Sequence, residues 1–217
     1  MDSKTTQYSD SEIILKIIKG ETALFEMLIR RNNPFLYKVG RSYNYSHEDT
    51  QDLMQETFIQ AYIHLSKFEN RSSFKTWIIK IMLHNCFHKQ QKASFKNETH
   101  NEINEKATPM FSNTHSDTLK TVTNKELRTV IENALQQIPQ DYRIVFSLRE
   151  MNGLNVAETS ALLNITESNV KARLNRSKTM LRKIVEQSYT PEDIYEFNLI
   201  YCDAIVDHVM EKIKQLS

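Results

Sequence analysis

The sequence predicts an all-α protein made of two small helical domains, a flexible linker and a C-terminal helix. Residues that form turns are rare, because the 217 residues include only three Gly and four Pro. All-β folds and doubly wound α/β folds need many more tight turns than this allows. Apolar residues make up 40% of the chain and recur at spacings of three and four, the period of amphipathic helices. Ser followed three residues later by Glu or Asp marks two of the expected helix starts.

Four helices are expected in the N-terminal half. Ser9 and Glu12 form a capping box that begins the first, and Gly20 ends it. The second begins at Glu21, and we expect it to be interrupted near Pro34 before it continues to about residue 43. These two helices carry isoleucine and phenylalanine on one side, as core helices do.

The third helix begins after Ser46, with Asp49 completing a second capping box. Its expected buried side consists of Met54, Phe58, Ala61, Tyr62 and Leu65. A short polar stretch, 68–73, leads to a fourth helix from Phe74 to about Gln90. We therefore expect the polar loop 68–73 to connect the third and fourth helices, which are both amphipathic.

The second half begins with a polar, aperiodic segment. We place the first domain at 8–92, the linker at 93–118, the second domain at 119–187 and a C-terminal extension at 188–217. Within the second domain, one helix ends at Pro139 and another runs from Gln140 to Gly153. A short helix (156–163), a turn and a basic helix capped by Thr166 follow, which is the helix-turn-helix pattern.

The charges are balanced in total but divided along the chain. The 28 Lys and Arg and 27 Asp and Glu give a net charge of +1. Residues 71–96 contain six basic residues and no acid, 166–187 contain six basic residues and two acids, and 42–66 are acidic without Lys or Arg. Each run alone is typical of a solvated helix surface. Together they indicate two contacts with a polyanion and one with a basic protein.

Several classes of function are excluded. Three scattered Gly cannot build a phosphate-binding loop, which argues against nucleotide-hydrolysing motors and Rossmann oxidoreductases. Two cysteines make neither a disulfide framework nor a structural zinc site. His84, Cys86 and His88 cannot converge on one metal, since Cys86 points to another side of the helix. We expect no metal or cofactor, no signal peptide or membrane span, and a cytoplasmic location.

The basic helix has the composition of a DNA-reading helix. Arg can read guanine and Asn can read adenine, while Lys suits phosphates. The apolar residues expected to pack the basic helix against the preceding short helix, and so to brace it, are Val156, Leu162, Leu163, Ile165, Val170 and Leu174. The residues expected to face DNA are Ser168, Asn169, Lys171, Ala172, Arg173, Asn175, Arg176 and Lys178. The same pattern also fits an ordinary amphipathic surface helix.

Two motifs carry a family resemblance. Residues 52–62, Phe68 and 73–81 resemble domain two of bacterial RNA polymerase sigma factors of the sigma-seventy family, in the extracytoplasmic-function (ECF) subfamily. Ile138-Pro139, 155–158 and 169–177 are similar to domain four. The match spans almost all of residues 10–187 in the right order. It implies a non-catalytic factor that directs core RNA polymerase to promoters and opens the minus-ten element.

The resemblance also implies the roles of single residues. The surface that docks on core RNA polymerase corresponds to Asp49, Asp52, Gln55, Glu56 and Ile59. Contacts with minus-ten DNA correspond to Phe68, Asn70, Arg71, Ser72, Ser73, Lys75, Trp77, Lys80 and His84. Trp77 could equally belong to the core. The helix-turn-helix corresponds to the reader of the minus-thirty-five element, and an anti-sigma factor is a further partner.

The sequence departs from the family pattern in places and leaves alternatives open. Thr159 and Ser160 stand where Ile and Ala are usual, which puts hydroxyls near the helix contact. The extension 190–217 is broadly apolar, and either packs on domain four or regulates the protein. A conventional repressor or activator, or a helical protein-binding scaffold, remain the rival functions.

Overall fold

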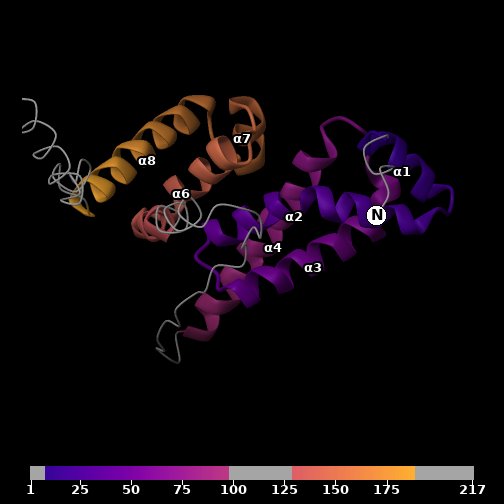
Figure 1. The fold of residues 1–217 in the computed structure, drawn as a ribbon, viewed down its shortest axis with the longest axis horizontal. Helices are drawn as coiled ribbons and strands as arrows, with labels where there is room; N and C mark the ends of the chain where they lie inside the picture. The colour runs from indigo at the N-terminus through magenta and orange to yellow at the C-terminus, as the bar shows by residue number, and fades with distance from the viewer. Residues whose placement is uncertain (1–7, 98–128, 189–217) are drawn as a thin grey trace, which may run out of the picture.

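The computed structural model describes residues 8–97 and 129–188, and every regular element in these ranges is a helix (Figure 1). One group contains α1 to α4. The other contains the helical residues 129–137, then α6, η3, α7 and α8. Most of the linker and of the C-terminal extension named above lies outside the described residues. Within these residues no helix is long and apolar enough to cross a membrane.

Helix α1 (Asp10–Ile18) begins with the predicted capping box, in which Ser9 accepts from the Glu12 N–H and the Glu12 carboxylate accepts from the Ser9 N–H. A 3-10 turn, η1 (Thr22–Leu24), leads into α2 (Phe25–Ser42). The predicted interruption near Pro34 is wrong, because α2 runs through the proline. Leu28 and Leu36, before and after Pro34, are fully buried, so their packing outweighs the one backbone hydrogen bond that proline removes.

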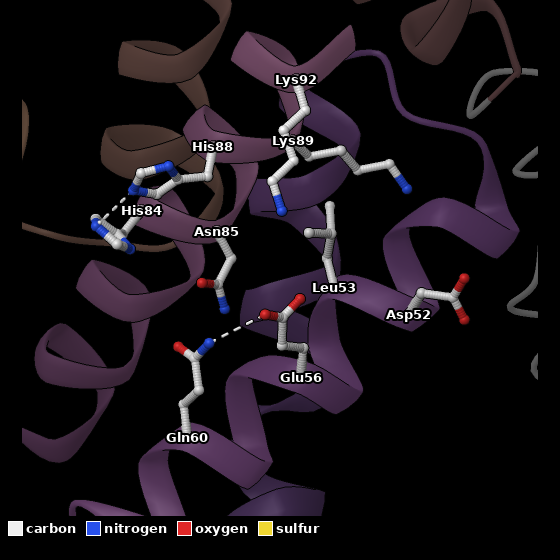
Figure 2. Close-up of a pocket in the computed structure, with 9 residues that line it drawn as sticks. All are labelled: Asp52, Leu53, Glu56, Gln60, His84, Asn85, His88, Lys89 and Lys92. Carbon is white, nitrogen blue, oxygen red and sulfur yellow. Dashed lines mark hydrogen bonds between the residues drawn. The ribbon is translucent and has the colours of Figure 1, made fainter.

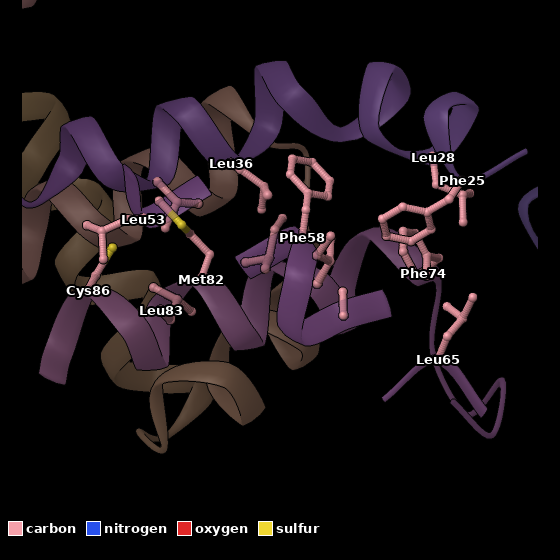
Figure 3. Close-up of a cluster of buried hydrophobic side chains, with 14 of the residues drawn as sticks. Phe25, Leu28, Leu36, Leu53, Phe58, Leu65, Phe74, Met82, Leu83 and Cys86 are labelled. Atoms are coloured by element: carbon pink, nitrogen blue, oxygen red, sulfur yellow. The ribbon is translucent and has the colours of Figure 1, made fainter. Parts of the chain in front are cut away.

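The core of the first group lies between α2, α3 (His47–Ile63) and α4 (Phe74–Asn97). Figure 3 shows Leu36, Phe58 and Met82 among the buried side chains between these helices. Gly40 of α2 lets the helices approach closely, since a Cβ there would lie 2.5 Å from Cγ2 of Thr50 on α3. This packing fixes the orientation of α3 and therefore of its outer side.

The second group is a helix-turn-helix with a supporting helix pair. Helix α6 (Gln140–Phe146) continues into a π-helical turn, η3 (Ser147–Met151), which the sequence pattern did not predict. Helix α7 (Val156–Leu163) has the predicted bounds, and Asn164 makes the turn in the left-handed region at φ 51°. Helix α8 (Glu167–Ser188) then packs against α6 and α7.

The two groups share one hydrophobic cluster. Ile144, Leu148 and Leu154 of the second group belong to the same buried cluster as the core of α2 and α4. Helix α2 also contacts both α6 and η3. In Figure 1 one end of α2 lies near α6. The described parts of the chain therefore form a closed arrangement of the two domains.

Candidate functional site

The outer side of α3 carries the residues predicted to dock on RNA polymerase. Asp52, Gln55, Glu56 and Ile59 are all exposed, and Ile59 leaves 60% of its surface in solvent. The opposite side of α3 packs in the core. Because the four exposed positions recur at spacings of three and four, their side chains form a continuous strip along the helix. Charged groups at the rim of such a strip can attract a partner protein over a distance, and an exposed isoleucine can be buried against that partner on binding.

The strip extends one turn beyond the sequence prediction. Ile63 is 63% exposed and follows Ile59 by one helical turn. Tyr62 was predicted to be buried, and that prediction is wrong, since it is 42% exposed. Its ring packs edge-to-face with that of Phe25, with 5.1 Å between the ring centres. Its neighbour Ala61 is the buried residue at this level, and one residue along a helix turns the side chain by about 100°. Extending the spacing of four from Ile59 would have identified Ile63.

Asp49 differs from the other residues of the predicted docking surface. Its carboxylate accepts a hydrogen bond from Lys89 of α4, and its side chain is 44% exposed. The hydrogen bond from the Lys89 ammonium lowers the pKa of Asp49 below the usual carboxyl range. Asp49 thus joins the start of α3 to α4 as well as adding charge near the strip.

A pocket of about 320 Å³ lies next to the strip and is lined by residues of both α3 and α4 (Figure 2). Asp52 and Glu56 line its α3 wall, while the α4 wall has His84, Asn85, His88, Lys89 and Lys92. His84 and His88 face each other, with 2.9 Å between their Nε2 atoms. Cys86 is buried in the core on another side of α4, as predicted, and burial raises the pKa of its thiol to about 12. The described residues contain no group of three or more side chains arranged to hold a metal.

The loop predicted to capture an unstacked base is anchored by aromatic packing. Phe68 lies 5.8 Å from the Phe74 ring and 5.2 Å from the Trp77 ring. Phe68 and Trp77 are half-buried, so each combines a packing role with an accessible edge. Asn70 adopts φ 54°, in the left-handed region, and its side chain accepts from the Ser11 hydroxyl at 3.3 Å.

The other residues of the predicted minus-ten surface lie on two different sides of α4. Arg71 and Ser72 are exposed in the loop, and Ser73 caps the helix by accepting from the Thr76 N–H at 3.1 Å. Lys80 and His84 are exposed on the solvent side. Lys75 instead turns toward the second domain, where its ammonium donates to the backbone carbonyl of Asn152 at 3.0 Å. The structure therefore does not bring the whole predicted set together on one open face.

The recognition helix α8 presents a mostly open polar side. Ser168, Asn169, Lys171, Ala172, Asn175 and Arg176 are exposed. Arg173 is partly covered by its ion pair with Asp141 at 3.0 Å, and Lys178 pairs with Glu150 at 3.0 Å. Both pairs hold α8 against the α6–η3 segment. Arg176 also reaches the Tyr142 hydroxyl at 3.4 Å.

Three of the six apolar residues predicted to hold α8 against the rest of its domain lie in the core or pack against it. Val170 is fully buried, and Leu162 and Leu163 pack on the core. The two hydroxyls that depart from the family pattern bond to nearby carbonyls, Thr159 to Asn155 at 2.8 Å and Ser160 to Ile165. They are therefore accommodated without an unpaired buried group.

Comparisons with known proteins match both domains. A family model described as Sigma-70 region 2 covers residues 28–94, and one described as Sigma-70, region 4 covers residues 128–181. The RNA polymerase sigma-H factor of Pseudomonas aeruginosa is 22% identical over 83% of this chain and 96% of its own length. The ECF RNA polymerase sigma-E factor of Escherichia coli is 25% identical over the same shares.

Solved structures have the same fold. A structure of CnrH in complex with the cytosolic domain of CnrY aligns with a TM-score of 0.58, at 19% identity, over 83% of this chain and 99% of that one. The sigma factor RpoE of Bartonella quintana, in complex with the anti-sigma factor NepR, aligns with a TM-score of 0.62, at 19% identity, over 75% and 96%. The two family models together cover more than half of this chain, in the order and spacing that the sequence predicted. The chain belongs to the sigma-70 family and is an ECF-type sigma factor for promoter-directed initiation of transcription.

Proposed function

We propose that the exposed strip of α3 binds core RNA polymerase while α4 and α8 contact two separate promoter elements. The observation that carries this proposal is the strip itself: Asp52, Glu56 and Ile59 are exposed together on a helix whose other side is fixed in the core. Surface carboxylates beside an exposed apolar group fit a basic protein surface better than they fit DNA.

On the DNA side, the loop 68–73 and the solvent side of α4 bind the opened minus-ten strand. Arg71 and Lys80 neutralise phosphates, and the amide of Asn70 reads the edge of a base taken out of the stack. The half-buried Trp77 offers an aromatic edge to a neighbouring base. These groups bind and position the strand, and the factor has no catalytic step of its own.

In the second domain, the N-terminal turns of α8 read the minus-thirty-five element in the major groove. Asn169 and Arg173 are the residues best suited to base edges, while Lys171 suits a phosphate. Arg173 must exchange its ion pair with Asp141 for the DNA contact. We propose a cytoplasmic location, core RNA polymerase and promoter DNA as partners, and an anti-sigma factor as a further partner, like the one bound to RpoE of Bartonella quintana.

Promoter-dependent run-off transcription tests this function. Transcripts that appear when the protein is overproduced in its host would be mapped to their start sites to define a promoter. The purified chain and core RNA polymerase should then produce a run-off transcript that neither makes alone. A conventional repressor or activator would bind its operator without polymerase, and a scaffold would bind no promoter at all. Either result would overturn the proposal.

A further inference from the structure

Two lysines of the first domain cap a helix end in the second domain. Lys38 of α2 donates to the carbonyl of Met151 at 2.9 Å, and Lys75 of α4 donates to the carbonyl of Asn152 at 3.0 Å. Both ammonium groups also lie over the ring of Phe35, at 5.7 and 4.8 Å from its centre. The two cations thus converge on the point where the α6–η3 segment ends.

The end of a helix is a site of negative partial charge. The last carbonyls of α6–η3 have no intrahelical donor, and the aligned peptide dipoles place partial negative charge there. The chain leaves this end through Gly153, at φ 68°. Lys38 and Lys75 satisfy these carbonyls, although they come from another domain. Two ammonium groups are therefore held by backbone dipoles rather than by a carboxylate.

Further hydrogen bonds between the two domains support the same closure. The Ser147 hydroxyl donates to the carbonyl of Lys38 at 3.0 Å, and the Thr76 hydroxyl donates to the carboxylate of Glu158 at 2.9 Å. Arg143, which is 5% exposed, donates to the carbonyl of Ser42 at 2.6 Å. Its guanidinium also donates to carbonyls at the end of the neighbouring helix, those of Leu135, Gln136 and Ile138.

We propose that these contacts form an intramolecular latch, in which the second domain caps Lys38 and Lys75 and withholds them from DNA phosphates. The latch rests on the proposed function, because Lys75 belongs to the predicted minus-ten surface. A phosphate carries a full negative charge, whereas a helix end carries about half of one. Promoter DNA therefore competes for both lysines and releases the second domain. Lys38 becomes a further DNA contact of the open form.

The latch can be weakened without touching either lysine. Thr76→Val together with Ser147→Ala removes the two hydroxyl donors across the interface and keeps every side chain of the proposed DNA contacts. It also removes the Thr76 hydroxyl that bonds the Ser73 hydroxyl at 2.8 Å, but the Thr76 N–H still donates to Ser73. A matched control is Thr179→Val together with Ser66→Ala, which removes the same atoms at exposed positions. The Thr179 hydroxyl bonds only within α8, to the carbonyl of Asn175. Circular dichroism checks that both variants keep the parental helix content.

Two measurements on the full chain test the latch. Small-angle X-ray scattering reports opening as a larger radius of gyration. Fluorescence anisotropy with a labelled 12-nucleotide oligo-dT strand reports access to the lysines. A neutral hydrogen bond such as that of Ser147 changes an equilibrium by roughly two- to tenfold, a bond to a carboxylate such as that of Thr76 to Glu158 changes it by more, and a masked site binds in proportion to the open fraction. We expect the latch variant to expand and to bind the strand at least about tenfold more tightly, with the control like the parent.

The proposal is overturned if the latch variant expands but binds the strand no more tightly than the parent, or if it does not expand while folded. Run-off transcription with the parent protein separates this failure from that of the proposed function. If the parent directs run-off and the variant binds no more tightly, the latch is wrong and the function stands. If no variant directs run-off, the function is wrong, and the binding comparison still decides the latch.

Discussion

The close contact between α2 and α3 predicts a measurable effect of Gly40→Ala. An added Cβ would lie 2.5 Å from Cγ2 of Thr50 and 3.0 Å from Cε of Met82. The Met82 methyl ends a flexible side chain and can move. Thr50 is fully buried and β-branched, and its hydroxyl donates to the carbonyl of Ser46 at 2.7 Å, so it cannot rotate away without losing that bond.

The magnitude follows from two opposing effects. Overpacking a core typically costs 1–3 kcal/mol, whereas replacing Gly by Ala within a helix gains about 1 kcal/mol. Because a separation of 2.5 Å is a severe overlap, the upper part of the overpacking range applies, about 2–3 kcal/mol. We therefore expect Gly40→Ala to lower the free energy of unfolding by about 1–2 kcal/mol, measured by urea unfolding followed by circular dichroism. Adding Thr50→Ser removes Cγ2 and keeps the hydroxyl. The double variant should recover about 1 kcal/mol relative to the sum of the single changes.

Two outcomes would contradict the close contact between Gly40 and Thr50. If Gly40→Ala is as stable as the parent or more stable, the helices do not approach as closely as the structure places them. If the double variant shows no coupling, the contact with Thr50 is not the cause of the loss. Thr50→Ser alone serves as the control, because it removes the same methyl without adding an atom at Gly40.

The remaining predictions concern the Asp49–Lys89 pair, Cys86 and Asn164. Because Lys89 lowers the pKa of Asp49, the pair stabilises the fold above the ordinary carboxyl pKa and loses this contribution as the pH falls through the folded-state pKa. Lys89→Met should therefore cost about 0.5 kcal/mol more at pH 7 than near pH 2, by urea unfolding at each pH, since the contact of the Lys89 ammonium with the Tyr45 ring is present at both pH values. An equal cost at the two pH values would contradict this. In a Cys202→Ser background, the buried Cys86 should react with a maleimide only after denaturation, and rapid labelling of the folded protein would show that the core is open. Asn164→Gly should change stability by a few tenths of a kcal/mol and Asn164→Ala should cost about 1 kcal/mol, whereas equal losses would argue against the left-handed turn.

Capping residues and helical periodicity correctly predicted the features that depend only on residues close together in the sequence. The Ser9 capping box and the bounds of α7 are confirmed because each depends on residues within one or two turns. The exposed strip on α3 also follows from local periodicity, which places Asp52 and Glu56 on the opposite side of the helix from the buried Phe58 and Ala61. The helix-turn-helix was predicted for the same reason.

Features that depend on packing between distant segments were missed. The uninterrupted course of α2 depends on burial around Pro34, which no local pattern encodes. The π-helical turn η3 lies where the second domain meets α2, and its bonds to Lys38 join residues more than a hundred positions apart. Sequence reasoning assigned Lys75 to an open DNA surface because it had no means of placing one domain against the other.

The measurement that tests the central claim most directly is the affinity of the full chain for core RNA polymerase after charge reversal on α3. Asp52→Lys with Glu56→Lys reverses the exposed strip. Glu26→Lys with Glu69→Lys makes the same charge change at exposed carboxylates elsewhere in the first domain, each of which is paired with an arginine. We expect the strip variant to bind at least tenfold more weakly and the control to bind like the parent. A folded strip variant that binds polymerase as tightly as the parent would contradict the account.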